Sequence, residues 1–524
     1  MMQTLSQTPI EQDPSSTKVA VARWATVDQR FRTMLDAGIP AGKALERRGR
    51  QLLQENRLPE AMQSFRLATV VEPANPECWR NYGILLDRTN ALTDAIDALE
   101  HSLKLSPSQP DTWLALGLTR AKLGAVDDAE AAYMKVLDLN PKSAIAWQCL
   151  GLLKEGIRNY GDAIDCFLTC IERGGATAAL WANLGKLLQQ TGRIAESCQA
   201  YAEAIRMDGT NPRFQAMLRR SRFRRDVFEG VPIDQALTAY LDFAPDRDTA
   251  DPDLAELFFT TFTFLAGFGH CDAAIRLGRK YLWMWPNSPS MEYLLKAVEG
   301  SADLDRSPPA YIKEHFDAFA AGFDAQLVGV LGYDIPEKLC AAVKAAADTG
   351  HRYDALDAGC GTGLCGPHLL PFVRTLTGVD LSEKMLGQAA KRGIYGDLIC
   401  EDLTTFLDKS DGRFDLVVAA DVMIYAGNLA SFMEAAARAI RPGGLLAFST
   451  EVVEEGTYKL LPSGRFAHSA AYVRSLAAGA FEEQACLETT IRWEAATRVP
   501  GHIFVFRRRR PAGKLSRNGA CRRD

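Results

Sequence analysis

Residues 355–370, ALDAGCGTGLCGPHLL, place four glycines directly after a short apolar run. These glycines are Gly359, Gly361, Gly363 and Gly366. Asp357 stands two positions before the first of them. A glycine-rich loop lets the backbone approach a bound molecule at points where any Cβ atom would collide with it. We therefore expect a ligand-binding loop here, with one carboxylate close to its start.

Two classes of cofactor-binding loop fit this spacing. Residues 361–366 fit the G-x-G-x-x-G fingerprint of dinucleotide-binding proteins, and residues 357–363 fit the acidic-then-glycine loop of S-adenosylmethionine enzymes. Both classes place an acid after the second strand for the ribose hydroxyls, and Asp380 stands there. An anionic residue ahead of the glycines does not help to bind an anionic pyrophosphate. The Asp357 carboxylate can instead attract the cationic sulfonium and amino group of S-adenosylmethionine. The loop favours S-adenosylmethionine, and a nucleotide-linked oxidoreductase is the alternative.

The elements that must position this loop alternate between strands and helices from about residue 350. Short apolar runs such as RYDALDAG, TLTGVDLS, FDLVVAADVM and GGLLAFSTE are separated by helical stretches such as SEKMLGQAAKR. This alternation predicts an α/β domain with a parallel, doubly wound sheet. Ligands bind beyond the carboxyl ends of such strands, so the acids that follow these runs are expected along one rim. They are Asp357, Asp380, Asp402 and Asp421.

The order and spacing of these motifs resemble the class I S-adenosylmethionine-dependent methyltransferases, especially the type 11 group, over about 350–450 and more loosely to 510. The resemblance implies a Rossmann-like domain in which the glycine loop contacts the methionine part and Asp380 holds the ribose. It also implies that Asp402 meets the adenine amino group. The cofactor-binding residues expected in this way are Asp357, Gly359, Gly361, Gly363, Asp380, Leu381, Met385, Asp402, Leu403 and Asp421. Asp380 can alternatively help to cap the next helix through Ser382.

Two pairs of residues are candidates for acceptor chemistry. Asp421 and Tyr425, in AADVMIY, are expected to line the acceptor pocket, or else to be a strand-end cap and a core tyrosine. His468 and Tyr472 are four apart and expected on one helical face, with His468 as a general base or as a structural group. AADVMIY lacks the Asn/Asp-Pro-Pro-Tyr of amino-methylating DNA and glutamine enzymes and the Pro-Cys of cytosine-C5 enzymes. A protein or small-molecule acceptor is expected, and nucleic acid is unlikely.

A second pattern, with a period of 34 residues, fills the first half of the chain. Glycines and tryptophans keep this interval at Gly49, Gly83, Gly117, Gly151 and Gly185 and at Trp79, Trp113, Trp147 and Trp181. The pattern resembles the tetratricopeptide repeat, a helix–turn–helix hairpin whose copies stack into a superhelix. Five units are clear over 42–211, and a degenerate one covers 255–288. The resemblance implies an all-α superhelix that binds a protein or peptide in its groove.

Composition and charge bound the function further. The 524 residues are 47% hydrophobic and 24% charged, which predicts several globular domains. Residues 507–524 hold eight Lys or Arg and one acid, so the net charge of −5 leaves −12 on the remainder and no basic footprint for nucleic acid. Twelve cysteines without a C-x-x-C pair predict a reducing compartment and no metal site. No apolar run approaches the ~20 residues that span a bilayer. We expect a cytoplasmic protein.

The predicted organisation is a multidomain chain with five parts. They are a disordered N-terminus (1–40), a repeat superhelix (41–300), a linker with lid helices (301–345), the methyltransferase domain (346–508) and a disordered basic tail (509–524). In the linker, Phe316-Asp317 and Phe323-Asp324 are seven apart, so both phenylalanines are expected on one helix face, as a lid over the cofactor or as plain packing. A cut after Gly300 is expected to expose one cap surface of the repeats and little else. A repeat scaffold whose methyltransferase fold senses cofactor or is inactive is a further alternative.

Overall fold

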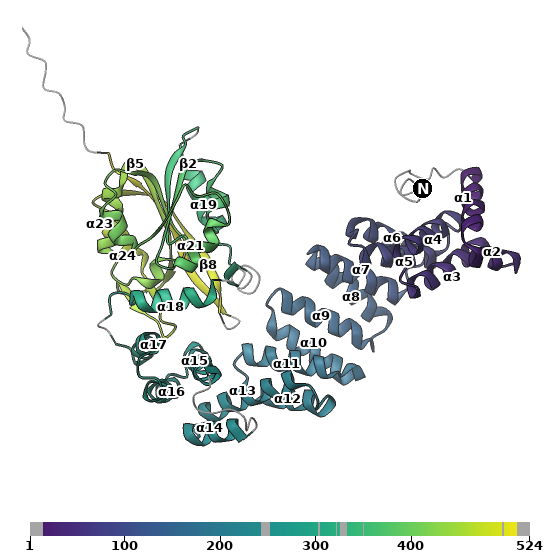
Figure 1. The fold of residues 1–524 in the computed structure, drawn as a ribbon, viewed down its shortest axis with the longest axis horizontal. Coiled ribbons are helices and arrows are strands. Elements are labelled where there is room, and N and C mark those ends of the chain that lie inside the picture. Colours follow the sequence, from purple (N-terminus) through teal and green to yellow (C-terminus); the bar gives the residue numbers. More distant parts are fainter. Residues whose placement is uncertain are drawn as a thin grey trace, which may run out of the picture. The chain divides into compact units, whose positions relative to one another are not determined.

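The computed structural model describes residues 14–242, 252–301, 304–320, 322–324, 333–348, 350–494 and 497–510. The chain divides into two compact units (Figure 1). The first comprises Met1–Leu188 and Gln199–Phe214, and the second comprises Gln189–Cys198 and Gln215–Asp524. In the part of the chain that is described, no helix has both the length and the apolar character needed to cross a bilayer.

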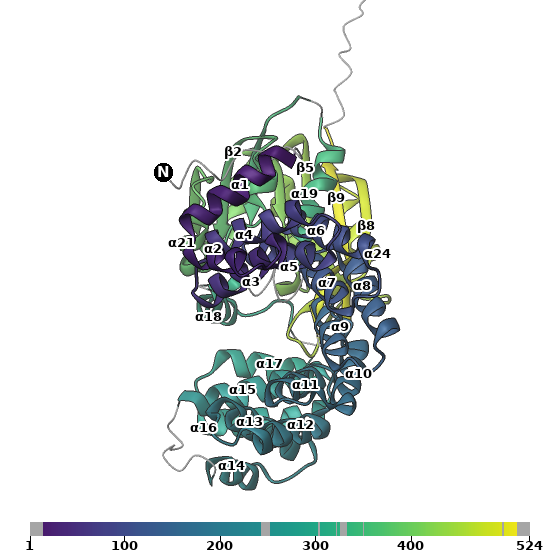
Figure 2. The same cartoon turned by 90° about the vertical axis from the view of Figure 1, so that its right-hand side faces the viewer.

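Antiparallel helix pairs follow one another along the first unit, and each pair packs on the next (Figure 2). The pairs are α3 (Ala41–Gln54) with α4 (Leu58–Val71), α5 (Pro76–Arg88) with α6 (Leu92–Leu105), α7 (Pro110–Leu123) with α8 (Val126–Leu139), α9 (Ala144–Gly156) with α10 (Tyr160–Cys170), and α11 (Ala178–Gln190) with α12 (Ile194–Met207). They match the five clear units of the 34-residue period.

The repeated glycines lie where the two helices of a pair touch. A Cβ atom at Gly151 would lie 2.3 Å from Cε1 of Phe167, and one at Gly117 would lie 2.5 Å from Cε1 of Tyr133. Both rings are fully buried, so they have no free space into which to move. The periodic glycine is therefore a consequence of close helix packing.

Two of the repeated tryptophans are hydrogen-bonded to the proline that precedes them, whereas the indole N–H of Trp147 has no such partner among the described residues. The indole Nε1–H of Trp79 donates to the carbonyl oxygen of Pro73 (2.9 Å), and that of Trp113 donates to Pro107 (2.8 Å). Each bond closes the turn between one hairpin and the next, because the proline ends one unit and the tryptophan begins the following one. This bond accounts for the paired spacing of proline and tryptophan in these two turns.

The prediction of disorder over 1–40 is wrong for the residues that the structure describes. Helices α1 (Pro14–Val27) and α2 (Gln29–Asp36) precede the first repeat. Trp24 and Phe31 are buried in one cluster with apolar side chains of α3 and α4. Asp28 caps α2 by accepting from the Phe31 N–H (2.9 Å) and also binds Arg48 (2.7 Å). Burial of the two aromatic rings holds this segment in place. Residues 1–13 lie outside the described range, as do residues 511–524 of the expected tail.

Helices also open the second unit. They are α13 (Pro212–Phe228), α14 (Ile233–Asp242), α15 (Pro252–Gly267), α16 (Cys271–Met284), α17 (Pro289–Glu299), α18 (Pro309–Phe319) and α19 (Ile335–Ala346). α15 packs on α16 and α16 on α17. The α15–α16 pair covers the degenerate repeat expected at 255–288.

The described residues of the second unit contain a nine-stranded sheet in the order β3-β2-β1-β4-β5-β7-β6, with β9 antiparallel to β5 and β8 paired to β9. Its strands are β1 (Tyr353–Ala358), β2 (Val373–Asp380), β3 (Asp397–Cys400), β4 (Phe414–Ala419), β5 (Ile440–Val452), β6 (Tyr458–Leu460), β7 (Phe466–His468), β8 (Phe481–Glu494) and β9 (Thr497–Arg508). β1 to β5 pair in parallel, which confirms the expected α/β class.

Alternating side chains bury both faces of this sheet. Leu356 packs in a cluster with residues of three helices, whereas its neighbour Ala355 packs with residues of α19. The three helices are α22 (Leu403–Asp408), α23 (Ala430–Ala439) and α24 (Ala470–Ala477). α23 and α24 lie along one face and α19 along the other (Figure 1). Two further helices are α20 (Gly366–Leu369) and α21 (Glu383–Ala390). The sheet is doubly wound, so its strand ends form an open rim.

The last repeat helix packs directly against the α/β region of the second unit. The hydroxyl of Tyr293, in α17, hydrogen-bonds to the carbonyl of Gly464 (2.8 Å) and to Oγ of Ser307 (2.7 Å). The N–H of Ser307 donates to the carbonyl of Tyr425 (2.8 Å), which follows β4. A cut after Gly300 would therefore expose a buried face. The cap surface expected at this cut thus includes the contacts of Tyr293 with Ser307 and Gly464.

Candidate cofactor and acceptor cavity

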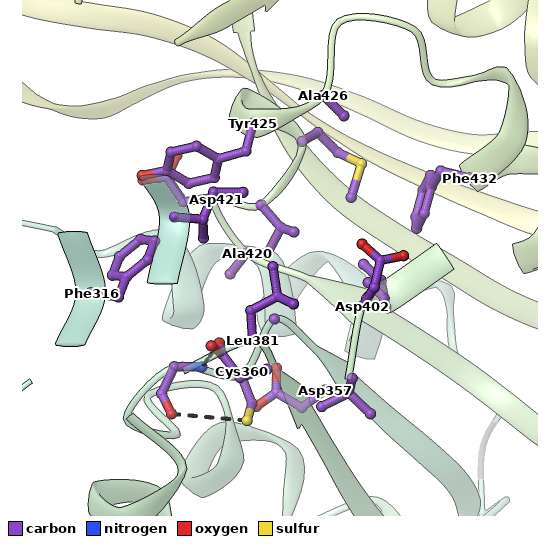
Figure 3. A pocket seen from close by; sticks show the side chains of 18 of the residues that line it. Phe316, Asp357, Cys360, Leu381, Asp402, Ala420, Asp421, Tyr425, Ala426 and Phe432 are labelled. Atoms are coloured by element: carbon purple, nitrogen blue, oxygen red, sulfur yellow. Dashed lines mark hydrogen bonds between the residues drawn. The ribbon is translucent and has the colours of Figure 1, made fainter. Parts of the chain in front are cut away.

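A cavity of about 620 Å³ lies at the carboxyl ends of the parallel strands (Figure 3). The glycine loop after β1, the ends of β2 and β4, the start of α22 and helix α18 line it. All four acids expected along one rim line this cavity: Asp357, Asp380, Asp402 and Asp421. Sequence-distant strand ends therefore converge on one site.

The glycine loop takes a left-handed backbone at the edge of the cavity. Gly359 has φ +68°, and its N–H donates to the carbonyl of Val379 at the end of β2 (2.8 Å). A Cβ atom there would lie 2.5 Å from Cγ2 of Val422. Gly361 has φ +53°, and a Cβ atom there would meet nothing within 4 Å. Gly359 is needed for packing, and Gly361 leaves space open beside the cavity.

The structure places Gly363 and Met385 away from the cavity. Gly363 has φ +85°, and its missing Cβ would lie 2.9 Å from Cε2 of Tyr395. Met385 is buried in the first turn of α21, where its N–H donates to the capping Ser382 hydroxyl (3.1 Å). The expected ligand contacts of these two residues are corrected to packing, because their positions serve the loop and the helix.

Asp357 is a buried carboxylate at the base of the cavity. Its Oδ2 accepts a hydrogen bond from the Tyr395 hydroxyl (2.6 Å). Burial raises the pKa of Asp357 to about 7, although the Tyr395 hydrogen bond acts in the opposite direction. A cationic group in the cavity would favour the charged form of this acid. Tyr395 was not identified from the sequence, since it lies 38 residues away.

The Asp380 carboxylate is fixed by the backbone. Its Oδ2 accepts from the N–H of Gly361 (2.9 Å), and its Oδ1 accepts from the N–H of Ser382 (2.9 Å). Burial raises the pKa of Asp380, and these backbone hydrogen bonds oppose the increase. Ser382, which caps α21, is held by Asp380, so the capping and ligand-binding interpretations are compatible. The carboxylate retains lone pairs for a diol at the rim.

Asp402 connects the cavity to the linker that follows the repeats. Its Oδ1 accepts from the Thr405 N–H (3.1 Å) as the cap of α22, and its Oδ2 accepts from Nη2 of Arg306 (2.7 Å). Burial acts to raise the pKa of Asp402, but the hydrogen bonds from Arg306 and Thr405 outweigh it and the pKa is lowered. Arg306 also lines the cavity, as do Leu381 and Leu403.

The other end of the cavity holds Asp421 and Tyr425. Asp421 has φ +59°, its N–H donates to Oγ of Ser449 (2.8 Å), and its carboxylate is 3.4 Å from Nη1 of Arg492. The ring of Tyr425 meets the ring of Phe316 edge to face, with centroids 5.7 Å apart. Figure 3 shows Phe316 and Tyr425 together at this end, with Asp402 on the opposite side.

Two arginines, Arg465 and Arg492, also line this end of the cavity. Arg492 is buried and donates to Glu494 (2.7 Å), Glu451 and Asp421. Arg465, from the loop between β6 and β7, donates to Glu494. This cluster was not identified from the sequence, because its members come from four separate segments.

His468 and Tyr472 do not line the cavity and do not share a helix. His468 ends strand β7, whereas Tyr472 lies in α24. Nε2–H of His468 donates to the carbonyl oxygens of Ala426 (2.8 Å) and Gly427 (3.1 Å). Burial lowers the pKa of His468 to about 4, so the ring is neutral at pH 7. The Tyr472 hydroxyl accepts from the N–H of Leu429 (3.0 Å). Both side chains hold the loop after Tyr425, and the expected general base is corrected to a structural histidine.

The Phe-Asp pairs of the linker lie over the rim. Phe316 and Phe323 both line the cavity, but α18 ends at Phe319, so the two rings do not share one helix. The Ser382 hydroxyl donates to Asp317 (2.5 Å), and the Thr362 hydroxyl donates to Asp324 (2.5 Å). The phenylalanines therefore face the cavity while the aspartates hold the segment to the loops after β1 and β2. Across the described residues, no group of three or more His, Cys, Asp or Glu is arranged to hold a metal ion.

Known families match both parts of the chain. Residues 356–448 match the family described as "Methyltransferase domain". Residues 83–144 and 178–211 match families described as "Tetratricopeptide repeat".

Curated relatives and a solved structure are similar to part of the chain. A ubiquinone biosynthesis O-methyltransferase of Idiomarina loihiensis is 32% identical over 99 residues, which are 18% of this chain and 41% of the relative. The Thiobacillus denitrificans protein of the same name is 31% identical over 150 residues, 26% of this chain and 64% of the relative. This chain thus spans about half the length of these relatives. A magnesium protoporphyrin IX methyltransferase from Synechocystis PCC 6803 shares 19% identity over 38% of this chain and 99% of its own, with a TM-score of 0.30. The chain thus contains a segment that matches methyltransferase domains and, before it, segments that match tetratricopeptide repeats.

Proposed function

We propose that the cavity binds S-adenosylmethionine and that the α/β domain transfers its methyl group to a protein or small molecule. The observation that carries this proposal is the pair of acids around an open glycine loop. Asp357 is buried where a cationic amino group would neutralise it, and Asp380 is fixed where it can accept from a ribose diol. Gly361 has no Cβ to obstruct the space between them. The family match over 356–448 supports the same conclusion.

The residues fit this cofactor by chemistry as well as by position. When bound, the sulfonium supplies a carbon already activated for in-line displacement. Asp357 would hold the amino group, Asp380 the ribose hydroxyls and Asp402 the adenine amino group, with Leu381 and Leu403 beside the base. The protein's task is then to align the acceptor and exclude water, which Phe316 and Tyr425 favour on the acceptor side.

Proton removal, where the acceptor needs it, is best assigned to Asp421. Asp421 lines the acceptor end of the cavity, and its carboxylate lies 3.4 Å from Nη1 of Arg492. His315 also lines the cavity, but burial lowers its pKa to about 4. Burial raises the pKa of the Tyr425 hydroxyl, so that group stays protonated. Alignment alone can also carry the reaction when the acceptor is already a nucleophile.

The ribose assignment is tested by Asp380→Ala. We expect affinity for S-adenosylhomocysteine to fall at least tenfold, about 1.4 kcal/mol, because a charge-assisted hydrogen bond is lost. Calorimetry measures the change. Asp397→Ala, at the exposed start of β3, is the matched control and should bind normally. Equal affinity in Asp380→Ala and the control would contradict the assignment.

Turnover separates the enzyme from its alternatives. Incubation with cell extract and labelled cofactor should yield S-adenosylhomocysteine and a labelled acceptor. Binding without turnover would favour a cofactor-sensing scaffold. A melting temperature raised by a nicotinamide dinucleotide instead would favour the oxidoreductase alternative.

We propose that the repeats bind a protein segment and thereby select the acceptor or a partner. Ile84, Leu118 and Leu152 each follow a repeat glycine and are 38%, 41% and 45% exposed, so one apolar position recurs along the stacked hairpins. Replacing all three with Asp should release that protein while cofactor affinity stays unchanged, and retained binding would remove this assignment. We also propose a cytoplasmic location, in keeping with eleven free cysteines among the described residues.

A further inference from the structure

We infer that the methyl acceptor carries an anionic group attached to an apolar body, and that Arg465 binds this group. The inference rests on the proposed methyltransferase function and concerns the acceptor end of the same cavity. It follows from the number of carboxylates that contact Arg465 and Arg492, the two arginines at this end.

Arg492 is already surrounded by carboxylates of the protein. Its Nε donates to Glu494 (2.7 Å), its Nη1 to Asp421 (3.4 Å), and its Nη2 to Glu451. Each guanidinium nitrogen thus has a carboxylate partner. Arg492 is buried, and these contacts compensate its charge within the protein.

Arg465 is only partly compensated. Among the described residues its guanidinium has one carboxylate partner, Glu494, which it reaches through Nη1 and shares with Arg492. Nε and Nη2 of Arg465 make no hydrogen bond within the described chain, and the side chain is 23% exposed where it lines the cavity. Guanidinium donors match the geometry of a carboxylate or phosphate. Arg465 therefore offers free donors to an anionic ligand.

Glu494 orients Arg465 toward the cavity. Burial acts to raise the pKa of Glu494, but Arg465 and Arg492 outweigh it and hold the pKa at about 2. Glu494 does not line the cavity, whereas Arg465 does. A charged carboxylate behind the guanidinium fixes one side of it and leaves the other side for a ligand.

The surroundings of Arg465 favour an apolar body next to the anion. Phe316 and Tyr425 form an aromatic corner, and neutral His315 lies beside Phe316 with ring centroids 5.3 Å apart. The other cavity arginine, Arg306, is paired with Asp402 on the cofactor side. Asp357 and Asp380, proposed to hold the cofactor, lie by the glycine loop, whereas Arg465 lies close to Tyr425 at the other end, where Asp421 and Glu451 are paired with Arg492.

The experiment measures binding of small probes by ligand-observed NMR titration. Benzoate, phenyl phosphate and benzamide are titrated into the full chain, with and without saturating S-adenosylhomocysteine. The variants are Arg465→Gln and Arg465→Lys, and Arg474→Gln is the control because its exposed ion pair with Glu483 lies outside the cavity. S-adenosylhomocysteine affinity is measured for every variant.

We expect the wild type to bind benzoate or phenyl phosphate, and to bind benzamide at least tenfold more weakly. The tighter of the two anions identifies the group. Arg465→Gln should lose at least tenfold in anion affinity with cofactor affinity unchanged, and Arg474→Gln should match the wild type. Should Arg465→Gln fail to fold, Arg465→Lys decides, because a point charge without the planar fork should bind the anion severalfold more weakly.

Benzamide binding equal to benzoate, or anion affinity unchanged in the Arg465 variants, would overturn the inference. If the wild type does not bind S-adenosylhomocysteine, that result would instead contradict the proposed function. The titrations without that ligand still test Arg465, so the two failures are distinguishable.

Discussion

Glycine has opposite roles in the two parts of this protein. In the repeats it lies in the middle of helices, and the space of its missing side chain is filled by a neighbouring ring, as Phe167 does at Gly151. In the loop after β1 the backbone is left-handed, and at Gly361 that space is open. The same residue type therefore marks close helix packing in one region and open space beside a cavity in the other.

The difference shows why glycine motifs need their structural context. Where a side chain of the same chain fills the space beside a glycine, replacing that glycine lowers the stability of the fold. Where a ligand fills the space beside a glycine, replacing that glycine lowers the affinity for the ligand. Substitution by alanine at the two kinds of position should separate these effects.

The largest effect is expected for Gly361→Ala. Its Cβ would occupy the space proposed for the methionine part, so affinity for S-adenosylhomocysteine should fall about a hundredfold, or ~2.7 kcal/mol. Gly412→Ala is the matched control, since Gly412 has φ +57°, lies in an exposed turn and also has nothing within 4 Å of its missing Cβ. Both variants should lose similar stability from backbone strain, and calorimetry should find a binding defect in Gly361→Ala alone. A defect of equal size in both would mean that strain, not ligand contact, explains the loop.

The next effect is expected for Gly151→Ala, in the middle of α9. Alanine improves helix propensity, but its Cβ would overlap the buried Phe167 ring, so we expect a net loss of about 2 kcal/mol in the stability of the repeats. Gly156→Ala, at the end of the same helix with nothing within 4 Å, should be neutral or stabilising. Thermal unfolding followed by circular dichroism compares the two. A more stable Gly151→Ala would refute close packing as the cause of the period.

The smallest expected effect is a pH dependence confined to the ligand site. The pKa of Asp357 is about 7, so the acid is protonated below neutral pH and loses its attraction for an amino group. Affinity for S-adenosylhomocysteine should fall about tenfold from pH 8 to pH 6. In Tyr395→Phe the hydrogen bond that lowers this pKa is absent, so the fall should begin at a higher pH. Tyr133→Phe in the repeats should leave the curve unchanged, and a flat wild-type curve would contradict this role for Asp357.

The sequence predicted those features that depend on local spacing. The period of 34 residues located the helix pairs because each pair repeats one packing contact, and the apolar runs located β1, β2, β4 and β5 because buried strands are continuous in sequence. The acids at the rim were predicted because parallel strands end at the same edge.

Partners distant in sequence were not predictable. Arg306 is 96 residues from Asp402, and Tyr395 is 38 residues from Asp357, so no periodicity connects them. The error at His468 had a local signal that was missed. Ser469 caps α24 by accepting from the N–H of Tyr472 (3.2 Å), which places His468 before the helix. The helices at 14–36 were missed because two buried aromatic rings in a polar segment give only a weak pattern.

The contact of Tyr293 with Gly464 and Ser307 has a consequence for how this protein melts. Tyr293 belongs to the repeats by its position in the chain, yet its hydroxyl joins the segments that surround the cavity. Helices α15–α17 should consequently unfold together with the sheet, in one cooperative transition rather than with the earlier hairpins. Any ligand that occupies the cavity would then raise the melting temperature of these three helices as well, although it touches none of them.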